Sequence, residues 1–249
     1  MRARARVGIS RIALAAALVV VVAIAGVGVY FALTPSGPST TTRLSSTAST
    51  SVAPLDVTVA AVPPSPWISP GQTQNYSSLQ VSALGAGPNG TVSVRAFPPN
   101  GLSLVLNQTS VPLSESPEHI PFALKAASGL STGNYSVIIE TSSSTSPARN
   151  QTLNVQVVAM LVTMQDLAFH PDNITVARGT RVTWLNLDST IGCCDPGNHN
   201  VSFTTGANAT SPTLSRFQSW TYAFGTTGVV DYYCTIHPAF MKGQVTVIG

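Results

Sequence analysis

Residues 231–243 read DYYCTIHPAFMKG and place a cysteine, a histidine and a methionine within eight residues: Cys234, His237 and Met241. The short apolar run that ends at Cys234 predicts a β-strand, and the run that begins at Gln244 predicts the next one. The three side chains are therefore expected on a loop between two strands, where their Cys-x2-His-x3-Met spacing can direct them to one point. A thiolate, an imidazole and a thioether are ligands that copper accepts.

A copper site of the blue type needs two imidazoles and one thiolate in a near-trigonal plane, with a weak axial thioether. The segment GNHNVSF (197–203) supplies the second imidazole through His199, at the start of a predicted strand. The end of such a strand can lie beside the loop that carries Cys234. Zinc commonly takes Cys, His or carboxylate ligands and has no need of the methionine.

Seven short apolar runs occupy residues 159–249, and turn residues such as Gly179 separate them. This number of short strands in about ninety residues suits a compact β-sandwich. The expected strands are MLVTMQDLAF (160–169), NITVARG (173–179), TRVTWLNLD (180–188), HNVSF (199–203), SWTYAF (219–224), VVDYYC (229–234) and QVTVIG (244–249).

Three segments of this region together carry a family resemblance: DNITVARGTRVTWLNLD (172–188), HNVSF (199–203) and YYCTIHPAFMKGQVTV (232–247). They resemble the cupredoxin family, especially its plastocyanin-, amicyanin- and halocyanin-like small blue copper proteins. The resemblance implies a Greek-key β-sandwich that holds one copper ion in a mononuclear blue-copper site.

Carried over residue by residue, the resemblance implies a complete ligand set. His199 and His237 would bind copper through imidazole nitrogens. Cys234 would be the thiolate ligand, and Met241 would be the axial ligand. Asn200 matches a family position that stiffens the site by hydrogen bonding near the cysteine sulfur.

Cys193 and Cys194 depart from the family pattern, because they lie in an insertion, IGCCDPGNHN (191–200), just before His199. They could form a bond with each other, link two chains or bind a second metal. A zinc site that combines both with His199 and Cys234 is the rival interpretation, although it leaves Met241 unexplained. A binuclear copper centre is disfavoured, because it needs two cysteines on the final loop.

Residues 55–158 alternate in the same way and predict another β-sandwich, of immunoglobulin-like architecture. This segment contains no cysteine, and its one histidine, His119, is isolated. We assign it no chemistry and expect a spacer or contact module. The expected strands are DVTVAAV (56–62), NYSSLQVSAL (75–84), GTVSVRAF (90–97), LSLVL (102–106), NYSVIIET (134–141) and QTLNVQVV (151–158).

The N-terminal region differs from both β-rich segments. Residues 12–33 form an uncharged apolar run of 22 residues, long enough to cross a bilayer as a helix. Because the arginines precede this run, the positive-inside rule keeps that end in the cytoplasm. We expect residues 1–33 to be a single-pass anchor in the cell membrane, with the rest of the chain extracytoplasmic. The arginines are Arg2, Arg4, Arg6 and Arg11.

A cleaved signal peptide is the alternative interpretation, because Ala23 and Ala25 resemble a small-residue cleavage site. The stretch that follows, residues 34–54, is rich in Ser, Thr and Pro and has little to bury. We expect it to be an extended linker that holds the folded domains away from the membrane.

Charge and sequons agree with this topology. Beyond the four N-terminal arginines, eight basic residues face nine acidic ones, so the formal charge of +3 marks no nucleic-acid surface. Eight Asn-x-Ser/Thr sequons could carry N-glycans on an exterior surface. They begin at Asn75, Asn89, Asn107, Asn134, Asn150, Asn173, Asn200 and Asn208.

The favoured interpretation is a one-electron carrier, with redox partner proteins in or near the membrane. No nucleophile–base pair, phosphate-binding loop or carboxylate pair stands out, so no enzymatic activity is expected. Residues 238–240, Pro-Ala-Phe, would form an apolar collar where the edge of His237 nears solvent. His170 is interpreted as a surface residue, and Trp184 and Tyr232 as core residues. Copper storage or delivery outside the cytoplasm is the alternative, and a metal-free adhesion or structural role is a third hypothesis.

Overall fold

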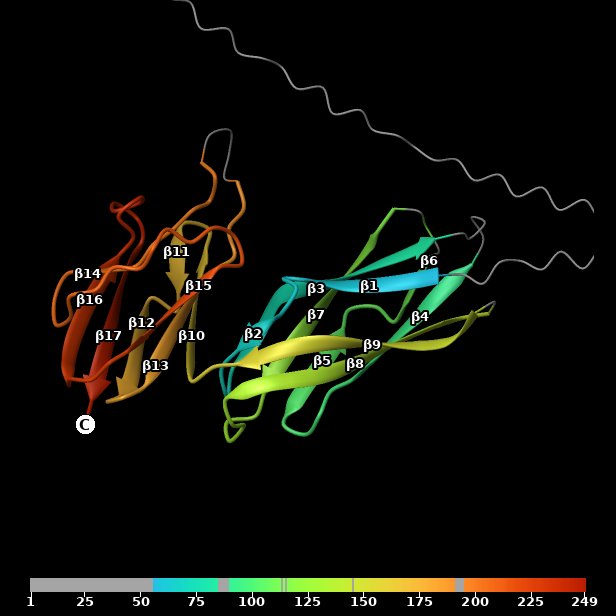
Figure 1. Ribbon diagram of the computed structural model, residues 1–249, viewed down its shortest axis with the longest axis horizontal. Helices are drawn as coiled ribbons and strands as arrows, with labels where there is room; N and C mark the ends of the chain where they lie inside the picture. The colour runs from blue at the N-terminus through green and yellow to red at the C-terminus, as the bar shows by residue number, and fades with distance from the viewer. Residues whose placement is uncertain (1–55, 85–89, 113, 115, 145, 191–194) are drawn as a thin grey trace, which may run out of the picture. The chain divides into compact units, whose positions relative to one another are not determined.

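The computed structural model describes residues 56–84, 90–112, 114, 116–144, 146–190 and 195–249. Every regular element in these residues is a β-strand, so the all-β prediction is confirmed for them (Figure 1). The predicted anchor at residues 12–33 and the linker at residues 34–54 lie outside the described residues. Within the described part of the chain, no helix has the length and apolar character needed to span a bilayer.

Residues 56–157 form two sheets. One has the order β1-β3-β7-β5, with β1 (Asp56–Val62), β3 (Thr73–Leu84), β7 (Glu118–Ala126) and β5 (Leu102–Leu106). The other has the order β2-β9-β8-β4-β6, with β2 (Trp67–Ile68), β9 (Ser146–Val157), β8 (Gly133–Ser143), β4 (Thr91–Phe97) and β6 (Ser110–Pro112). Strand neighbours run antiparallel, except for the parallel pair β2–β9.

The two sheets bury one shared and mainly aliphatic core. Alternation along β4 and β8 turns one face inward, so that Val94 and Val137 are fully buried. Strand β7 was not predicted, because Pro121 lacks an amide donor and interrupts the pattern. The structure places Pro121 on the exposed face, while Ile120 and Phe122 point into the core. The immunoglobulin-like designation of this segment stays a prediction.

Residues 160–248 form another pair of sheets. One has the order β11-β10-β13-β15, with β11 (Ala168–His170), β10 (Met160–Gln165), β13 (Arg181–Asn186) and β15 (Ser219–Ala223). The other has the order β12-β17-β16-β14, with β12 (Asn173–Ala177), β17 (Lys242–Ile248), β16 (Gly228–Tyr233) and β14 (Ser202–Phe203). The pairs β10–β13 and β12–β17 are parallel, so each joins strands that are distant in sequence.

The structure corrects two strand predictions in this region. The run predicted as one strand over residues 160–169 is a hairpin of β10 and β11, because Asp166 and Leu167 have φ values of 54° and 58° and reverse the chain. The strand predicted over residues 199–203 is limited to Ser202 and Phe203. His199 instead forms an isolated bridge with Leu214.

An aromatic cluster fills the space between these two sheets. Trp184 is 0% exposed, and its ring lies 5.5 Å from that of Tyr232 and 6.0 Å from that of Phe203. The prediction that Trp184 and Tyr232 are core residues is therefore confirmed. Strand β13 is buried at five consecutive positions, which is typical of a strand covered on both faces.

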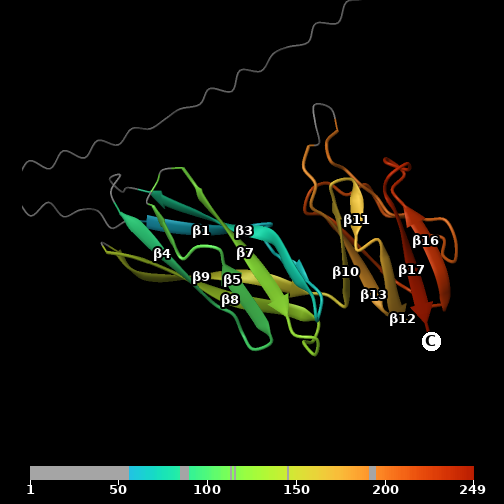
Figure 2. The ribbon, with the colours of Figure 1, turned by 180° about the vertical axis from the view of Figure 1, so that it is seen from behind.

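The β16–β17 loop lies at the end of its sheet away from the C-terminus, as both views show (Figures 1 and 2). The segment that precedes β14 reaches the same end of these sheets. This arrangement brings a segment that begins about residue 195 beside the loop that begins at Cys234.

Candidate metal centre

The β16–β17 loop is closed by its own backbone. Cys234 follows the last residue of β16, and its amide donates to the carbonyl of Met241 over 3.0 Å. The amides of Phe240 and Met241 donate to the carbonyl of His237 over 3.2 and 3.1 Å. These bonds hold the Cys234 and Met241 side chains in the core, where both are 0% exposed.

His199 is fixed by a second segment, between β13 and β14. Its amide donates to the carbonyl of Leu214 over 3.1 Å, and the amide of Leu214 donates back over 2.7 Å. Asn186, at the end of β13, donates its side-chain amide to the carbonyls of Gly197 and Leu214 over 2.7 and 2.8 Å. The His199 side chain is thereby held with no exposure to solvent.

Gly197 allows this segment to pass close to the end of β13. Its φ is 68°, in the left-handed region that favours glycine. A Cβ atom at this position would lie 2.0 Å from the carbonyl oxygen of Ser189. Any other residue would therefore push the segment that carries His199 away from β13.

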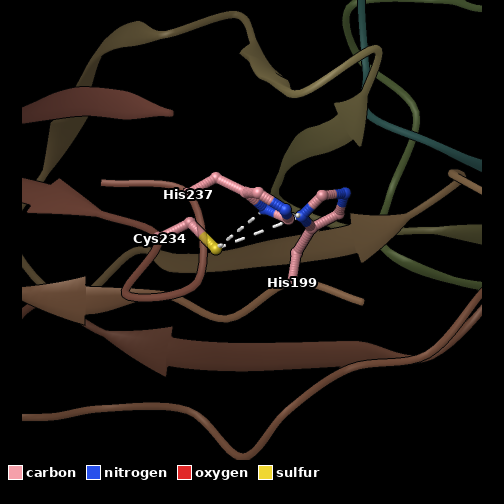
Figure 3. Close-up of side chains that lie close together, drawn as sticks. All are labelled: His199, Cys234 and His237. Carbon is pink, nitrogen blue, oxygen red and sulfur yellow. Dashed lines mark hydrogen bonds between the residues drawn. The ribbon is translucent and has the colours of Figure 1, made fainter. Parts of the chain in front are cut away.

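The ligand atoms of His199, Cys234 and His237 converge, and all lie within 4.8 Å of one another (Figure 3). The two Nδ1 atoms are 3.1 Å apart, and Cys234 Sγ lies 4.0 Å from Nδ1 of His199 and 3.8 Å from Nδ1 of His237. Imidazole nitrogens bind a metal at about 2.0–2.1 Å and thiolates at about 2.3 Å, so donors around one ion lie about 3–4 Å apart. The three residues fit a single metal ion.

Met241 is the fourth residue predicted at the site. It is buried in the same core cluster as Cys234, and its backbone closes the loop that carries Cys234 and His237. Its assignment as the axial ligand stays a prediction. Cys193 and Cys194 lie outside the described residues, so their pairing and any metal binding by them also stay predictions.

Asn200 joins the two ligand-bearing segments, and the predicted hydrogen bond near the sulfur is confirmed. Its backbone amide donates to Cys234 Sγ over 3.4 Å, and its side chain exchanges hydrogen bonds of 2.7 and 2.8 Å with Thr235. Asn200 is 8% exposed. Its sequon therefore cannot carry a glycan in the folded protein, because the amide that a glycan would occupy is bonded to Thr235.

Two aspartates beside the ligands were not predicted from the sequence. Asp188 Oδ2 lies 2.8 Å from His199 Nε2, and Asp195 Oδ2 lies 2.7 Å from His237 Nε2. A signal for them exists in the sequence, since the chain has only nine acidic residues and two precede His199 by eleven positions or fewer. That signal is weak, because closeness in sequence to His199 does not show which imidazole each carboxylate contacts.

The site favours an ionised cysteine even without a metal. Burial raises the pKa of the Cys234 thiol, but hydrogen bonds from His199 and from the backbone amide of Asn200 outweigh burial and lower it to about 6. Burial lowers the pKa of His199, but its hydrogen bonds to Cys234 and Asp188 outweigh this effect and raise the pKa. A thiolate is the form of cysteine that binds metal.

The other two histidines lie outside this cluster. His170 is exposed, as predicted, although it ends strand β11 and its Nε2 lies 3.2 Å from the carbonyl oxygen of Gln165. His119 is exposed on β7. Among the described residues, one group of three or more His, Cys, Asp or Glu side chains could hold a metal ion, and it is the one at His199.

Comparison with known proteins gives sequence relatives for this region. The model of the family described as copper binding proteins, plastocyanin/azurin family, matches residues 156–248. Amicyanin from Paracoccus versutus is 30% identical over 93 residues, which cover 36% of this chain and 64% of the amicyanin. Plastocyanin from Scenedesmus fuscus is 32% identical over 93 residues, which cover 32% of this chain and 87% of the plastocyanin. The chain thus spans slightly less than two thirds of the amicyanin's length.

Solved structures of similar proteins include amicyanin variants. A point mutant of amicyanin in its Cu(I) form is 29% identical, with 36% of this chain and 81% of that chain covered and a TM-score of 0.31. A purple cupredoxin from Nitrosopumilus maritimus is 26% identical, with 36% of this chain and 99% of that chain covered and the same TM-score of 0.31.

Proposed function

Because the chain belongs, through residues 156–248, to the plastocyanin/azurin family of copper-binding proteins, we propose that it is a one-electron carrier. The observation that supports this proposal most directly is the convergence of two imidazole nitrogens and one cysteine sulfur within 4.8 Å. A carrier of this kind passes electrons between other proteins and transforms no substrate.

Each residue of the site has a role in this proposal. His199 and His237 would hold one copper ion through Nδ1, Cys234 would hold it as a thiolate, and Met241 would supply a weakly bound thioether. Copper held there supplies a one-electron couple between Cu(II) and Cu(I), which suits this mixture of imidazole, thiolate and thioether. Zinc would lack such a couple, and the buried thioether would have no role in its binding.

The residues around the ligands keep the site stiff. Protein groups alone make the hydrogen bonds that close the loop, between Cys234, His237 and Met241. The same holds for the hydrogen bonds between Asn200 and Thr235. The ligand positions are therefore set before a metal arrives and need little adjustment when one electron is gained or lost. A small adjustment keeps the barrier to electron transfer low.

The exposed apolar residues of the ligand loop offer a docking surface for redox partners. Ile236 is 44% exposed and Phe240 is 75% exposed, and Pro238 and Ala239 between them are exposed as well. The side chain of His237 is 13% exposed at this loop. Partners would dock briefly on this apolar surface, and electrons would pass through the His237 ring.

The proposal includes a membrane location. Residues 12–33 are apolar and follow four arginines, which favours a single-pass anchor with the copper domain outside the cytoplasm. Redox partners would then lie in or near the same membrane, and exposed sequons could carry N-glycans. Intact mass and N-terminal sequence of the mature protein test whether residues 1–33 are retained.

The proposed function is tested with the full-length protein loaded with Cu(II). We expect an intense visible absorption band from thiolate-to-copper charge transfer, a spin-resonance spectrum of one copper per chain, and a reversible one-electron couple. Cys234→Ser should abolish the visible band, because an alcohol is a far weaker ligand and donor than a thiolate. His170→Gln is the matched control and should leave all three properties unchanged.

Three outcomes would contradict the proposal. Copper-loaded protein with no charge-transfer band would exclude a Cu–thiolate site. A band accompanied by an irreversible couple, with copper lost on reduction, would favour the alternative role in copper storage or delivery. Wild-type metal content in Cys234→Ser would exclude both copper roles.

A further inference from the structure

Each of the two imidazoles at the centre has a carboxylate on its far side. His199 and His237 turn Nδ1 toward each other and toward Cys234 (Figure 3). The opposite nitrogen, Nε2, lies 2.8 Å from Asp188 in one ring and 2.7 Å from Asp195 in the other. Each ring therefore lies between the metal position and an acidic side chain.

Both carboxylates are fixed by further hydrogen bonds. Asp188 is 6% exposed, and its two oxygens accept the backbone amides of Asp166 and Leu167 over 2.8 and 3.3 Å. Asp195 accepts the amide of Gly197 over 2.8 Å through Oδ1, which leaves Oδ2 for His237. Neither aspartate forms an ion pair with a lysine or arginine among the described residues.

The position of the ring proton follows from this geometry. An ionised carboxylate can only accept hydrogen bonds, so each Nε2 must carry a proton. A neutral imidazole carries one proton, and Nδ1 is therefore left with its lone pair toward the metal. Carboxylate partners of this kind set the tautomer and the orientation of metal-binding histidines and make them stronger donors.

The same two carboxylates act on the charge of the site. The thiolate and both aspartates place three negative charges around the metal position, and the described residues offer them no lysine or arginine partner. Negative charge favours Cu(II) over Cu(I), and solvent screens a buried group such as Asp188 only weakly. The carboxylates should therefore stabilise the oxidised site more than the reduced site.

We propose that Asp188 and Asp195 are positioning residues that keep the proton of each ligand imidazole on Nε2 and stabilise the oxidised site, so that they lower its reduction potential. This inference rests on the proposed copper site. It also assigns a function to Asp195, whose carboxylate contacts Nε2 of His237.

The experiment compares Asp195→Asn and Asp195→Ala in the full-length protein. The first keeps an acceptor oxygen and loses the charge, and the second loses both. Each should lower the ratio of Cu(II) to Cu(I) binding constants about tenfold, which equals a rise in reduction potential of about 59 mV. Asp188→Asn should have a larger effect, because Asp188 is more deeply buried than Asp195.

Asp231→Asn is the charge-matched control. Asp231 lies in the same domain, but its carboxylate accepts from Gln244 and Thr205 and contacts no ligand. This control should change the ratio of binding constants by less than about twofold. A role for Asp195 in folding alone would leave the ratio unchanged in copper-loaded protein, and that result would overturn the proposal.

A second readout uses copper-free protein and so does not depend on the proposed function. Nitrogen NMR of the imidazoles, at a pH where both rings are neutral, should show the proton on Nε2 in the wild type and in Asp195→Asn. Asp195→Ala should shift His237 to a mixture of tautomers. A mixture already present in the wild type would overturn the proposal, whereas a wild type without a charge-transfer band would overturn only the copper assignment.

Asp188→Asn could fail to fold, because one amide oxygen would replace two carboxylate oxygens that accept three hydrogen bonds. The Asp195 variants keep the proposal testable in that case, since the Asp195 side chain is 29% exposed and its replacement disturbs little of the core.

Discussion

The core of residues 56–157 and the core of residues 160–248 bury different kinds of side chain. The first is mainly aliphatic, and its buried polar residues carry no ionisable group among those described: Ser69, Gln74, Ser77 and Thr141. The second buries an aromatic cluster together with a carboxylate, an imidazole and a thiol, from Asp188, His199 and Cys234. Both regions are built from two four- or five-stranded sheets, so architecture does not explain the difference.

The difference shows where the molecule carries chemistry. Burying an ionisable group costs free energy unless hydrogen bonds or a bound ion compensate for it. An aliphatic core incurs no such cost. Burying Asp188, His199 and Cys234 in one core costs free energy, and a bound metal ion would compensate for this cost.

The largest expected effect is a selective stabilisation by copper. At a free copper concentration 1,000 times the dissociation constant, binding should add about 4 kcal/mol to the free energy of unfolding of the region that binds it. Amide hydrogen exchange should slow in β10–β17 and stay unchanged in β1–β9. Equal slowing in both regions would contradict a site confined to the second core, and Cys234→Ser should remove most of the effect.

Asn186→Leu should have the next largest effect. The Asn186 side chain is 0% exposed and makes three hydrogen bonds, to Gly197, Leu214 and Asp188. Its loss leaves buried backbone groups without partners and should cost about 2–4 kcal/mol. Urea unfolding of the copper-free protein measures this change. If the variant unfolded at the same urea concentration as the wild type, the hydrogen bonds of the Asn186 side chain would add no net stability.

A third expectation concerns the acidity of the one cysteine in the described residues. Hydrogen bonds that favour the thiolate should bring its titration midpoint to about 6 from an ordinary value of 9.0. Ultraviolet absorbance of the copper-free thiolate measures the midpoint, in a variant with Cys193→Ser and Cys194→Ser so that a single thiol titrates. A midpoint near the ordinary value would mean that His199 and the backbone amides do not act on the sulfur in solution.

Thr141→Val in the first core should have the smallest effect. The Thr141 hydroxyl is buried in β8 and has no hydrogen-bond partner in the described structure. Replacing an unpartnered buried hydroxyl by a methyl group of similar shape is nearly neutral or stabilising, within about 1 kcal/mol. A clear loss of stability in urea unfolding would show that polar groups of the first core matter as much as Asn186 does in the second.

The sequence was sufficient to predict the convergent residues because local spacing carries much of their geometry. Cys234 and His237 lie on one short loop, so their separation along the chain limits their separation in space. His199 was predicted from the motif His-Asn-Val and its resemblance to the cupredoxin family. Asp188 and Asp195 were missed because their contacts with the imidazoles depend on how distant segments cross.

Strands were predictable where apolar and polar residues alternate regularly. They were less predictable where non-glycine residues adopt positive φ values. The run over residues 56–62 matches β1 along its whole length. The hairpin at Asp166 was missed because Asp and Leu are unusual at two successive left-handed positions. Asp188 helps to explain it, since its carboxylate accepts the amides of both turn residues.

The placement of β17 determines when the centre can form during synthesis. This last strand lies between β12 and β16 within its sheet, and its first residue follows Met241 directly. A ribosome must therefore have released residues up to about 248 before β12 gains its parallel neighbour and the Cys234 loop can close. A chain that stops short of β17 should therefore remain colourless in the presence of copper.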